Sequence, residues 1–376
     1  MSKTVFIITG EPSGDLHGAN LIRALRRLDP SLSIKVVGGI RMKKAGADLI
    51  YDIGEISVVG FLEVLKKLPL LHRVYRRTFD AIKNERPSCV IFIDYPGFNL
   101  RLAKDVHRLG IKTVYYILPQ IWAWGKSRIH EIKKHLDKVL VIFPFEATLC
   151  KDHDIDVTFV GHPLLEAINP PADARAQCAK KNIDPTQPCV AILPGSRAES
   201  IRHNLPLMLE AYQEATKKIP GGLQAIVIKS PYHDERIYKD IIAGRRNVIL
   251  AEDPDYAIRS CATAAISALG TANLEMAILK IPTVVAYRTH LVNFALGRSL
   301  VGLSYLSLIN IVAGKKVVEE FLQHQATPVA VGNALAKLIQ DASYRAALTQ
   351  ELTRVKEKLG VSGASPRAAQ EILNIL

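Results

Sequence analysis

The residues best suited to chemistry in this chain lie directly after short apolar runs. Asp94 follows the run Cys89–Ile93, and a carboxylate in that place can act as a general base for a sugar hydroxyl. The alternative is a turn aspartate that caps the helix expected over Leu100–Leu109. We expect Asp94 at the rim of a cleft, because ligands of open α/β sheets bind at the carboxyl ends of the strands.

A second turn, Pro194–Arg197, carries groups that bind a diphosphate. It follows the apolar run Val190–Leu193. Main-chain amides around Gly195, the hydroxyl of Ser196 and the guanidinium of Arg197 can surround a pyrophosphate, since a planar guanidinium bonds two oxygens at once. The alternative is a surface turn with a solvated arginine.

A third turn contains Gly270 and Thr271 and follows the run Ala264–Ser267. Glu275 lies one turn into the helix that begins there, where it can accept two hydrogen bonds from a ribose diol. The alternative is a glutamate that only stabilises the start of its helix through the helix dipole.

The glycine-rich stretch Gly10–Ala19 follows the first apolar run and opens a helix. Glycines allow tight turns and close backbone approach, and helix N-termini bind anions. The alternative is an ordinary strand-to-helix turn in which Ser13 or Asp15 is the N-cap. The stretch matches neither the dinucleotide fingerprint nor the P-loop, so the sequence does not support dinucleotide binding.

Apolar, β-branched runs alternate with amphipathic helical stretches along the chain. The runs that predict strands are Val5–Ile8, Ile34–Val37, Cys89–Ile93, Lys112–Ile117, Val139–Ile142, Val190–Leu193, Ala225–Ile228, Val248–Leu250, Ala264–Ser267 and Thr283–Ala286. This alternation implies parallel sheets covered on both faces. The rhythm breaks at Gly161–Pro171 and then restarts, so we predict two doubly wound α/β domains whose strand ends face a shared cleft. A phosphate-binding turn and Glu275 in the second domain, combined with Asp94 and the Gly10–Ala19 stretch in the first, are typical of a two-domain nucleotide-sugar transferase.

Composition narrows the class of protein. A chain of 376 residues is long for a single core, and its net charge of +13 favours anionic partners such as nucleic acid, phospholipid headgroups or phosphorylated substrates. The five cysteines show no CxxC spacing, which argues against a disulfide framework or a zinc ribbon and favours a reducing cytosol. We find no signal peptide and no apolar run of spanning length.

Several widely spaced motifs in one order resemble those of bacterial lipid-A-disaccharide synthases. Besides the four turns above, the matching stretches are Val59–Leu65, Trp122–Trp124, Pro144–Glu146, Val160–Pro163 and Asn310–Gly314. The match runs nearly end to end.

The resemblance implies a GT-B fold, with two Rossmann-like domains facing a cleft. We expect an acceptor-binding, membrane-associating domain over 1–165, a UDP-sugar-binding domain over 172–340 and a helical tail over 341–376. The implied reaction is an inverting, metal-independent transfer that needs no cofactor. UDP-2,3-diacylglucosamine and 2,3-diacylglucosamine 1-phosphate give the β-1,6-linked lipid A disaccharide 1-phosphate and UDP, a step of lipopolysaccharide synthesis. A homodimer through C-terminal segments is also implied.

The family's functional residues carry over position by position. Asp94 matches the base, and Glu11 and Ser13 match the functional N-terminal loop. The positions expected to contact UDP or its phosphates are Gly195, Ser196, Arg197, Gly270, Thr271, Glu275 and Asn310. The chain departs from the family pattern at Gly97, where many members carry a second acid, and at Ile309, where proline usually precedes the asparagine.

Residues 56–77 combine dense apolar positions with interleaved bases, which is how a protein lies on an anionic bilayer. Both substrates carry acyl chains, so we expect peripheral binding to the cytoplasmic face of the inner membrane. The residues expected to contact the membrane are Val59, Phe61, Leu62, Leu65, Lys66, Leu68, Leu71 and Arg73. The alternative is an ordinary core helix with solvated bases.

Two rivals come from other classes. One is another GT-B UDP-sugar enzyme, such as a UDP-N-acetylglucosamine transferase or a UDP-sugar 2-epimerase, because fold alone does not settle function. The other is a nucleic-acid-binding protein, which the charge suggests; the chain, however, lacks the usual motifs and its bases scatter over both halves. Trp122 and Trp124 are either a sugar platform or core residues.

Overall fold

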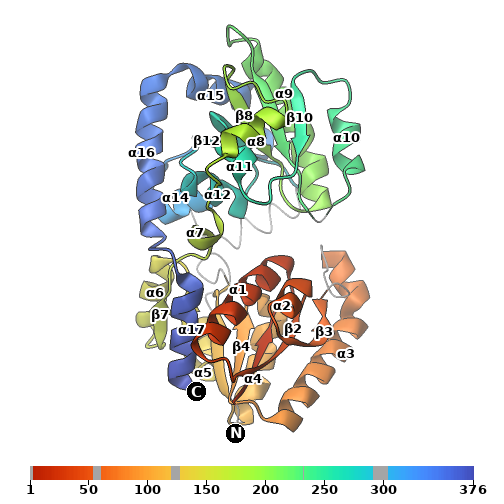
Figure 1. The fold of residues 1–376 in the computed structure, drawn as a ribbon, viewed down its shortest axis with the longest axis vertical. Coiled ribbons are helices and arrows are strands. Elements are labelled where there is room, and N and C mark those ends of the chain that lie inside the picture. Colours follow the sequence, from red (N-terminus) through yellow and green to blue (C-terminus); the bar gives the residue numbers. More distant parts are fainter. Residues whose placement is uncertain (1–2, 54–60, 120–127, 232, 291–303) are drawn as a thin grey trace. The chain divides into compact units, whose positions relative to one another are not determined.

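The computed structural model describes residues 3–53, 61–119, 128–231, 233–290 and 304–376, with only the backbone for 12 and 61–68. The chain forms two compact units (Figure 1). Unit 1 consists of Met1–Pro163 and Gly360–Leu376, and unit 2 of Leu164–Leu359. The stretch 341–376, treated above as one tail, is therefore divided between the two units.

Unit 1 is a seven-stranded parallel sheet in the order β3-β2-β1-β4-β5-β6-β7. Its strands are β1 Thr4–Ile8, β2 Ser33–Gly38, β3 Asp48–Asp52, β4 Cys89–Ile93, β5 Lys112–Tyr116, β6 Lys138–Val141 and β7 Val157–Phe159. Its helices are α1 Pro12–Leu28, α2 Ile40–Lys44, α3 Phe61–Glu85, α4 Pro96–Arg108, α5 Arg128–His135, α6 Pro144–Lys151 and α17 Ala364–Ile375. All five residues of β4 are buried, as expected for a central parallel strand covered on both faces.

The strand order of unit 1 reverses between β1 and β4, which lie side by side with Ile8 opposite Phe92. In open α/β sheets the connections on either side of such a point leave the sheet in opposite directions, and ligands bind beside the loops that follow the two strands. Gly10 and Asp94 each lie two residues beyond this pair. The turns at Gly10 and Asp94 therefore emerge from the sheet next to each other.

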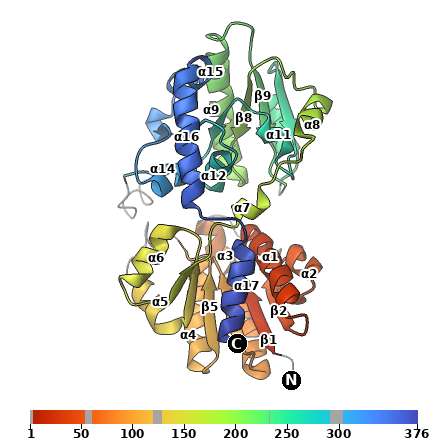
Figure 2. The same cartoon turned by 60° about the vertical axis from the view of Figure 1, so that its left-hand side comes forward.

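The last helix, α17, belongs to unit 1. It packs against α1 and contacts β5, and Figure 2 shows it lying along this unit. Arg367 donates through Nε to the carbonyl of Val160 at 2.8 Å, and Glu371 pairs with Lys138 at 3.3 Å. These contacts attach the C-terminal helix to β6 and to the segment after β7, at one edge of the same sheet.

Unit 2 is a six-stranded parallel sheet in the order β10-β9-β8-β11-β12-β13. Its strands are β8 Cys189–Leu193, β9 Gln224–Ile228, β10 Val248–Ala251, β11 Ala264–Ser267, β12 Thr283–Tyr287 and β13 Glu320–Leu322. Its helices are α7 Leu164–Ala167, α8 Ala174–Lys180, α9 Ala198–Thr216, α10 Arg236–Ile242, α11 Ala257–Ser260, α12 Thr271–Ile278, α14 Leu308–Ala313, α15 Pro328–Gln340 and α16 Ala342–Lys358. The order reverses between β8 and β11, where Leu193 lies opposite Ser267. Among the described helices, none is both long and apolar enough to cross a bilayer.

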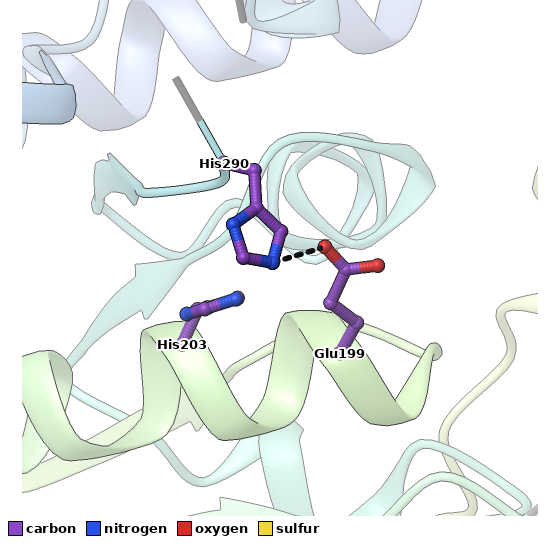
Figure 3. Close-up of side chains that lie close together, drawn as sticks. All are labelled: Glu199, His203 and His290. Carbon is purple, nitrogen blue, oxygen red and sulfur yellow. Dashed lines mark ion pairs between the residues drawn. The ribbon is translucent and has the colours of Figure 1, made fainter. Parts of the chain in front are cut away.

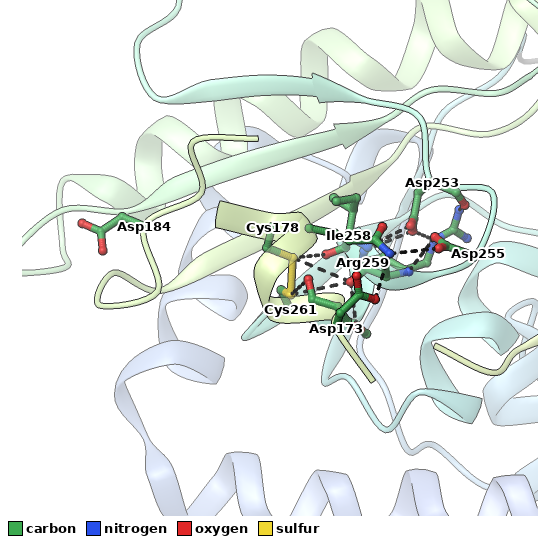
Figure 4. Close-up of a disulfide and its surroundings, with 12 residues drawn as sticks. Asp173, Cys178, Asp184, Asp253, Asp255, Ile258, Arg259 and Cys261 are labelled. Carbon is green, nitrogen blue, oxygen red and sulfur yellow. Dashed lines mark hydrogen bonds and ion pairs between the residues drawn. A yellow bond between two sulfur atoms is a disulfide. The ribbon is translucent and has the colours of Figure 1, made fainter. Parts of the chain in front are cut away.

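One feature contradicts the expectation from cysteine spacing. Cys178, at the end of α8, and Cys261, just after α11, form a disulfide across 83 residues of sequence (Figure 4). The remaining cysteines, Cys89, Cys150 and Cys189, are free and buried, as expected of inert core thiols. Spacing failed to predict the bond because the two sulfurs are brought together by helices that are distant in sequence.

Candidate active site

Asp94 directly follows β4 in a left-handed backbone conformation, with φ 48°, and Tyr95 comes next with φ 52°. Non-glycine residues seldom adopt this region, and two in succession persist only where the surroundings hold them. The buried amide of Asn99 donates to the carbonyl of Asp94 at 2.7 Å and to that of Ile93 at 3.2 Å. The hydroxyl of Tyr115 donates to the same Asp94 carbonyl at 2.5 Å. These bonds hold the backbone at Asp94 in this conformation.

The environment of Asp94 suits a base. Burial, and after it the negative charge of Glu11, raise the pKa of Asp94 from its ordinary 3.8 to about 6. A general base works best when its pKa lies near the operating pH, and strongly perturbed acids cluster at functional sites. The structure therefore brings Glu11 and Asp94, which are 83 positions apart, into one electrostatic unit.

The loop after β1 approaches β4 closely. A Cβ on Gly10 would lie 2.3 Å from the ring of Tyr95, so only glycine allows this contact. Glu11 occupies the N-cap position of α1, and Ser13 is exposed in the first turn. The alternative that Ser13 or Asp15 caps α1 is wrong, because no side chain caps this helix.

Asp15 instead holds the neighbouring helix. Its buried carboxylate accepts from the amides of Gly39 at 2.8 Å and of Arg41 and Met42 at 3.1 Å, which is the N-terminus of α2. Sequence reasoning missed this role because the partner amides lie more than twenty residues away.

Burial also lowers the pKa of His17 to about 4 and that of His162 to about 3, so both imidazoles are neutral near pH 7.

In unit 2, the turn after β8 is held from within α9. Gly195 has φ 111°, and a Cβ there would lie 2.4 Å from Oγ of Ser200. That hydroxyl donates to the carbonyl of Pro194 at 2.9 Å. Ser196 and Arg197 are exposed, and Arg197 occupies the N-cap position of α9. The open end of this nineteen-residue helix and the guanidinium together form a site suited to phosphate.

The turn after β11 lies beside it. The amide of Ala268 donates to the carbonyl of Leu193 at 2.9 Å, which joins the two turns at the switch point of the sheet. Gly270 has φ 128° and ψ −162°, a region that only glycine adopts without strain. Thr271 is exposed as the first residue of α12. The structure thus brings the predicted phosphate turn and the Gly270 turn together.

Glu275 lies on α12 in a buried ionic cluster that the sequence did not reveal. Arg259, from α11, lies between Glu275 and Asp253, with Nη1 2.5 Å from Glu275 Oε2 and Nε 2.6 Å from Asp253 Oδ2. Glu275 therefore interacts with the guanidinium of Arg259 in addition to the dipole of its own helix. The only sequence signal was an arginine on a short, otherwise apolar segment.

Asn310 lies inside unit 2, with its amide completely buried. The amide donates to the carbonyl of Val318 at 2.9 Å and to Glu320 at 2.7 Å, and it accepts from the amides of Val317 at 2.7 Å and Val318 at 2.9 Å. These four bonds use both donors and both acceptors, so Asn310 joins α14 to the segment before β13. Ile309 beside it is equally buried.

Only part of the predicted membrane segment is described. Val59, Trp122 and Trp124 lie outside the described residues, and so do the side chains of Phe61, Leu62, Leu65, Lys66 and Leu68. Leu71 packs against the hydrophobic core of unit 1, and Arg73 is exposed. In this half of α3 the apolar side chains thus face the core and the bases face solvent.

At Gly97 a Cβ would meet nothing within 4 Å, so this position has room for a side chain.

One cluster has the residue types of a metal site. Glu199 and His203 lie one turn apart on α9, and His290 follows β12 (Figure 3). Their ligand atoms lie within 4.8 Å of one another, and Glu199 Oε1 is 3.5 Å from His290 Nε2. All three side chains are exposed, and the ion pair accounts for their approach, so the cluster by itself does not indicate a bound ion.

Comparison with known proteins places these features in a family. Residues 5–372 match the family described as lipid-A-disaccharide synthetase. The chain is 36% identical over 375 residues to the lipid-A-disaccharide synthase of Coxiella burnetii (strain RSA 331), covering all of this chain and 99% of that one. It is 34% identical over 375 residues to that of Geobacter metallireducens, covering all of this chain and 98% of the relative.

Solved structures agree on the fold. A UDP-GlcNAc 2-epimerase from Neisseria meningitidis bound to UDP-GlcNAc matches with a TM-score of 0.67 at 12% identity, over 99% of this chain and all of that one. The calicheamicin glycosyltransferase CalG4 matches with a TM-score of 0.63 at 16% identity, over all of this chain and 98% of that one. At these identities the likeness shows the fold alone, and it confirms the predicted pair of parallel-sheet domains of the GT-B type. Since a family match over nearly the whole length is joined by full-length relatives above 30% identity, the chain belongs to the lipid-A-disaccharide synthase family and is a glycosyltransferase of lipid A disaccharide synthesis.

Proposed function

We propose that the chain transfers a diacylglucosaminyl group from UDP-2,3-diacylglucosamine to the 6-hydroxyl of 2,3-diacylglucosamine 1-phosphate, with inversion. The observation that carries the proposal is the acid at the switch point of unit 1. Asp94 has a pKa of about 6 and a backbone held in a left-handed conformation at the end of β4. The pairing of β8 with β11 in unit 2 brings together two glycine turns suited to a nucleoside diphosphate.

The proposed step forms one bond and breaks one. Asp94 takes the proton of the acceptor's 6-hydroxyl while the oxygen of that hydroxyl attacks the anomeric carbon of the donor. The bond from this carbon to the diphosphate oxygen breaks. The electron pair leaves with UDP. Arg197 and the amides around Gly195 stabilise the charge that grows on the diphosphate, a role for donors that are already in place.

The direct test supplies both substrates to the intact chain and measures released UDP together with the disaccharide product. Asp94→Asn should lower turnover by about 10²- to 10⁴-fold while UDP still binds, because it removes a positioned base. Near-normal turnover of this variant would show that another group is the base. Conversion of UDP-N-acetylglucosamine into its 2-epimer, without transfer, would favour the epimerase rival instead.

We further propose that the protein binds the cytoplasmic face of the inner membrane peripherally, in part through the bases of α3. His72, Arg73, Arg76 and Arg77 are exposed on the described half of this helix. Such binding should weaken with salt, because screening acts on exposed charges. Sedimentation with anionic and with neutral vesicles at low and high salt tests this. Equal recovery in all four conditions would contradict it.

A homodimer through C-terminal segments remains part of the proposal. Light scattering on the purified chain, with and without α17 substitutions at exposed positions, measures the mass directly. A monomer mass at assay concentration would exclude the dimer.

A further inference from the structure

We propose that Arg259 is a positioning residue that holds the carboxylate of Glu275 ready to bind the 2′- and 3′-hydroxyls of the donor's ribose. The inference rests on the proposed function, since it concerns the same nucleotide site. It adds a residue outside all the motifs that the sequence analysis singled out.

The first support is geometric. The side chain of Arg259 is only 10% exposed, and its guanidinium bridges Asp253 and Glu275 at 2.6 and 2.5 Å. The guanidinium also lies over the ring of Tyr256, 4.6 Å from the centroid. Three neighbours therefore fix one planar group, so the Glu275 oxygen that it contacts is fixed as well.

The second support is that Arg259 is itself held. Asp253 accepts from the amides of Ile258 at 2.8 Å and of Arg259 at 3.0 Å, which orients the start of α11. The residue after α11, Cys261, is bonded to Cys178 on α8 (Figure 4). Asp253 and this disulfide restrain the segment that carries Arg259 at both of its ends.

The third support is what remains free on Glu275. Arg259 contacts Oε2, whereas among the described residues Oε1 has only the hydroxyl of Tyr256, at 3.5 Å. This distance is at the outer limit of a hydrogen bond, and an ionised carboxylate accepts about four in all. Oε1 is therefore available to accept from a ligand.

Charge selects the chemistry of that ligand. Two carboxylates surround one guanidinium, so Asp253, Arg259 and Glu275 together leave one negative charge. A buried negative group repels phosphate and favours neutral hydroxyl donors. A vicinal diol offers two such donors, and the ribose of a UDP-sugar has one. Without Arg259, burial would act on Glu275 with less opposition, and the carboxyl would tend to take a proton and lose its strength as an acceptor.

The test compares UDP with 2′-deoxy-UDP by calorimetry on the full chain. The unsubstituted protein should bind UDP about 10- to 100-fold more tightly, which is the usual value of one hydrogen bond to a charged group. Glu275→Gln and Arg259→Met should each bring this ratio close to one while binding of 2′-deoxy-UDP changes little. Arg259→Lys, which keeps a charge but not the planar fork, should give an intermediate ratio.

Arg345→Met is the matched control, because Arg345 lies in the same unit and, within the described part of the chain, its guanidinium donates to the carbonyls of Leu338 and Ile339. It should keep the full ratio. An unchanged ratio in Arg259→Met, or an equal loss of both ligands there, would overturn the inference, since the second outcome indicates a merely structural arginine. If Arg259→Met does not fold, as judged by its melting curve, Arg259→Lys decides by the same ratio. Failure of the unsubstituted protein to bind UDP would refute the proposed function itself.

Discussion

The charge of Glu11 should contribute to the pH at which the enzyme loses activity. The base is active only when Asp94 is deprotonated, so activity should fall as pH falls through a pKa of about 6. Glu11→Gln removes a negative charge that helps to keep the proton on Asp94. In the variant Asp94 should therefore stay deprotonated to lower pH. The acidic limb of the pH–activity profile, where activity falls with falling pH, should move to lower pH.

The size of the effect follows from the causes of the raised pKa. The pKa rises from 3.8 to about 6, and burial is the larger cause, with Glu11 second. Glu11 is the smaller of the two causes that raise the pKa of Asp94, and a hydrogen bond from the backbone of Tyr95 opposes both, so we expect a displacement of about one pH unit. Glu11→Asp keeps the charge and should leave the limb close to its original position.

The assay is kcat/KM for UDP release, measured from roughly pH 4.5 to 8 for the unsubstituted chain and both variants, because this ratio reports the free enzyme's essential groups. Differences in absolute activity among the three proteins do not affect the comparison, since only the position of the acidic limb is read. Equal limbs in all three proteins would refute the electrostatic coupling. A displacement toward alkaline pH in Glu11→Gln would show that Glu11 favours the ionised form of Asp94.

Three further predictions concern unit 2. Gly270→Ala should lower the free energy of unfolding, measured in urea, by about 1–3 kcal/mol and should weaken UDP binding, because a backbone with φ 128° and ψ −162° is strained for any residue with a side chain. Gly244→Ala is the milder control, because Gly244 has φ 75° and its Cβ would meet nothing within 4 Å. Cys178→Ser should lower the stability of the oxidised protein by about 2–4 kcal/mol, and a reductant should abolish the difference from the unsubstituted chain. EDTA should leave the rate of UDP release unchanged, and the substitution His203→Ala should leave that rate unchanged as well. If EDTA abolished the activity and a divalent cation restored it, the cluster of Figure 3 would have a function as a metal site.

Most of the strands that sequence periodicity predicted have buried runs, although β10, an edge strand that is only partly buried, was predicted as well. Cys89–Ile93 and Ala264–Ser267 were placed to the residue, since a strand covered on both faces must be apolar throughout. The strands that were missed, β3, β7 and β13, lie at sheet edges and are only half-buried. An edge strand packs on fewer neighbours, so its sequence carries little periodic signal.

Sequence alone singled out the turns that we expect to carry the chemistry, because a glycine, an acid or an arginine directly after an apolar run is visible as a local pattern. It could not determine which distant groups act on those residues. The raised pKa of Asp94 depends on Glu11, and the setting of Glu275 depends on Arg259 and Asp253. These couplings arise only when strand order brings separate loops to one edge of a sheet. Electrostatic interactions depend on distance in space and on burial, and tertiary structure decides both.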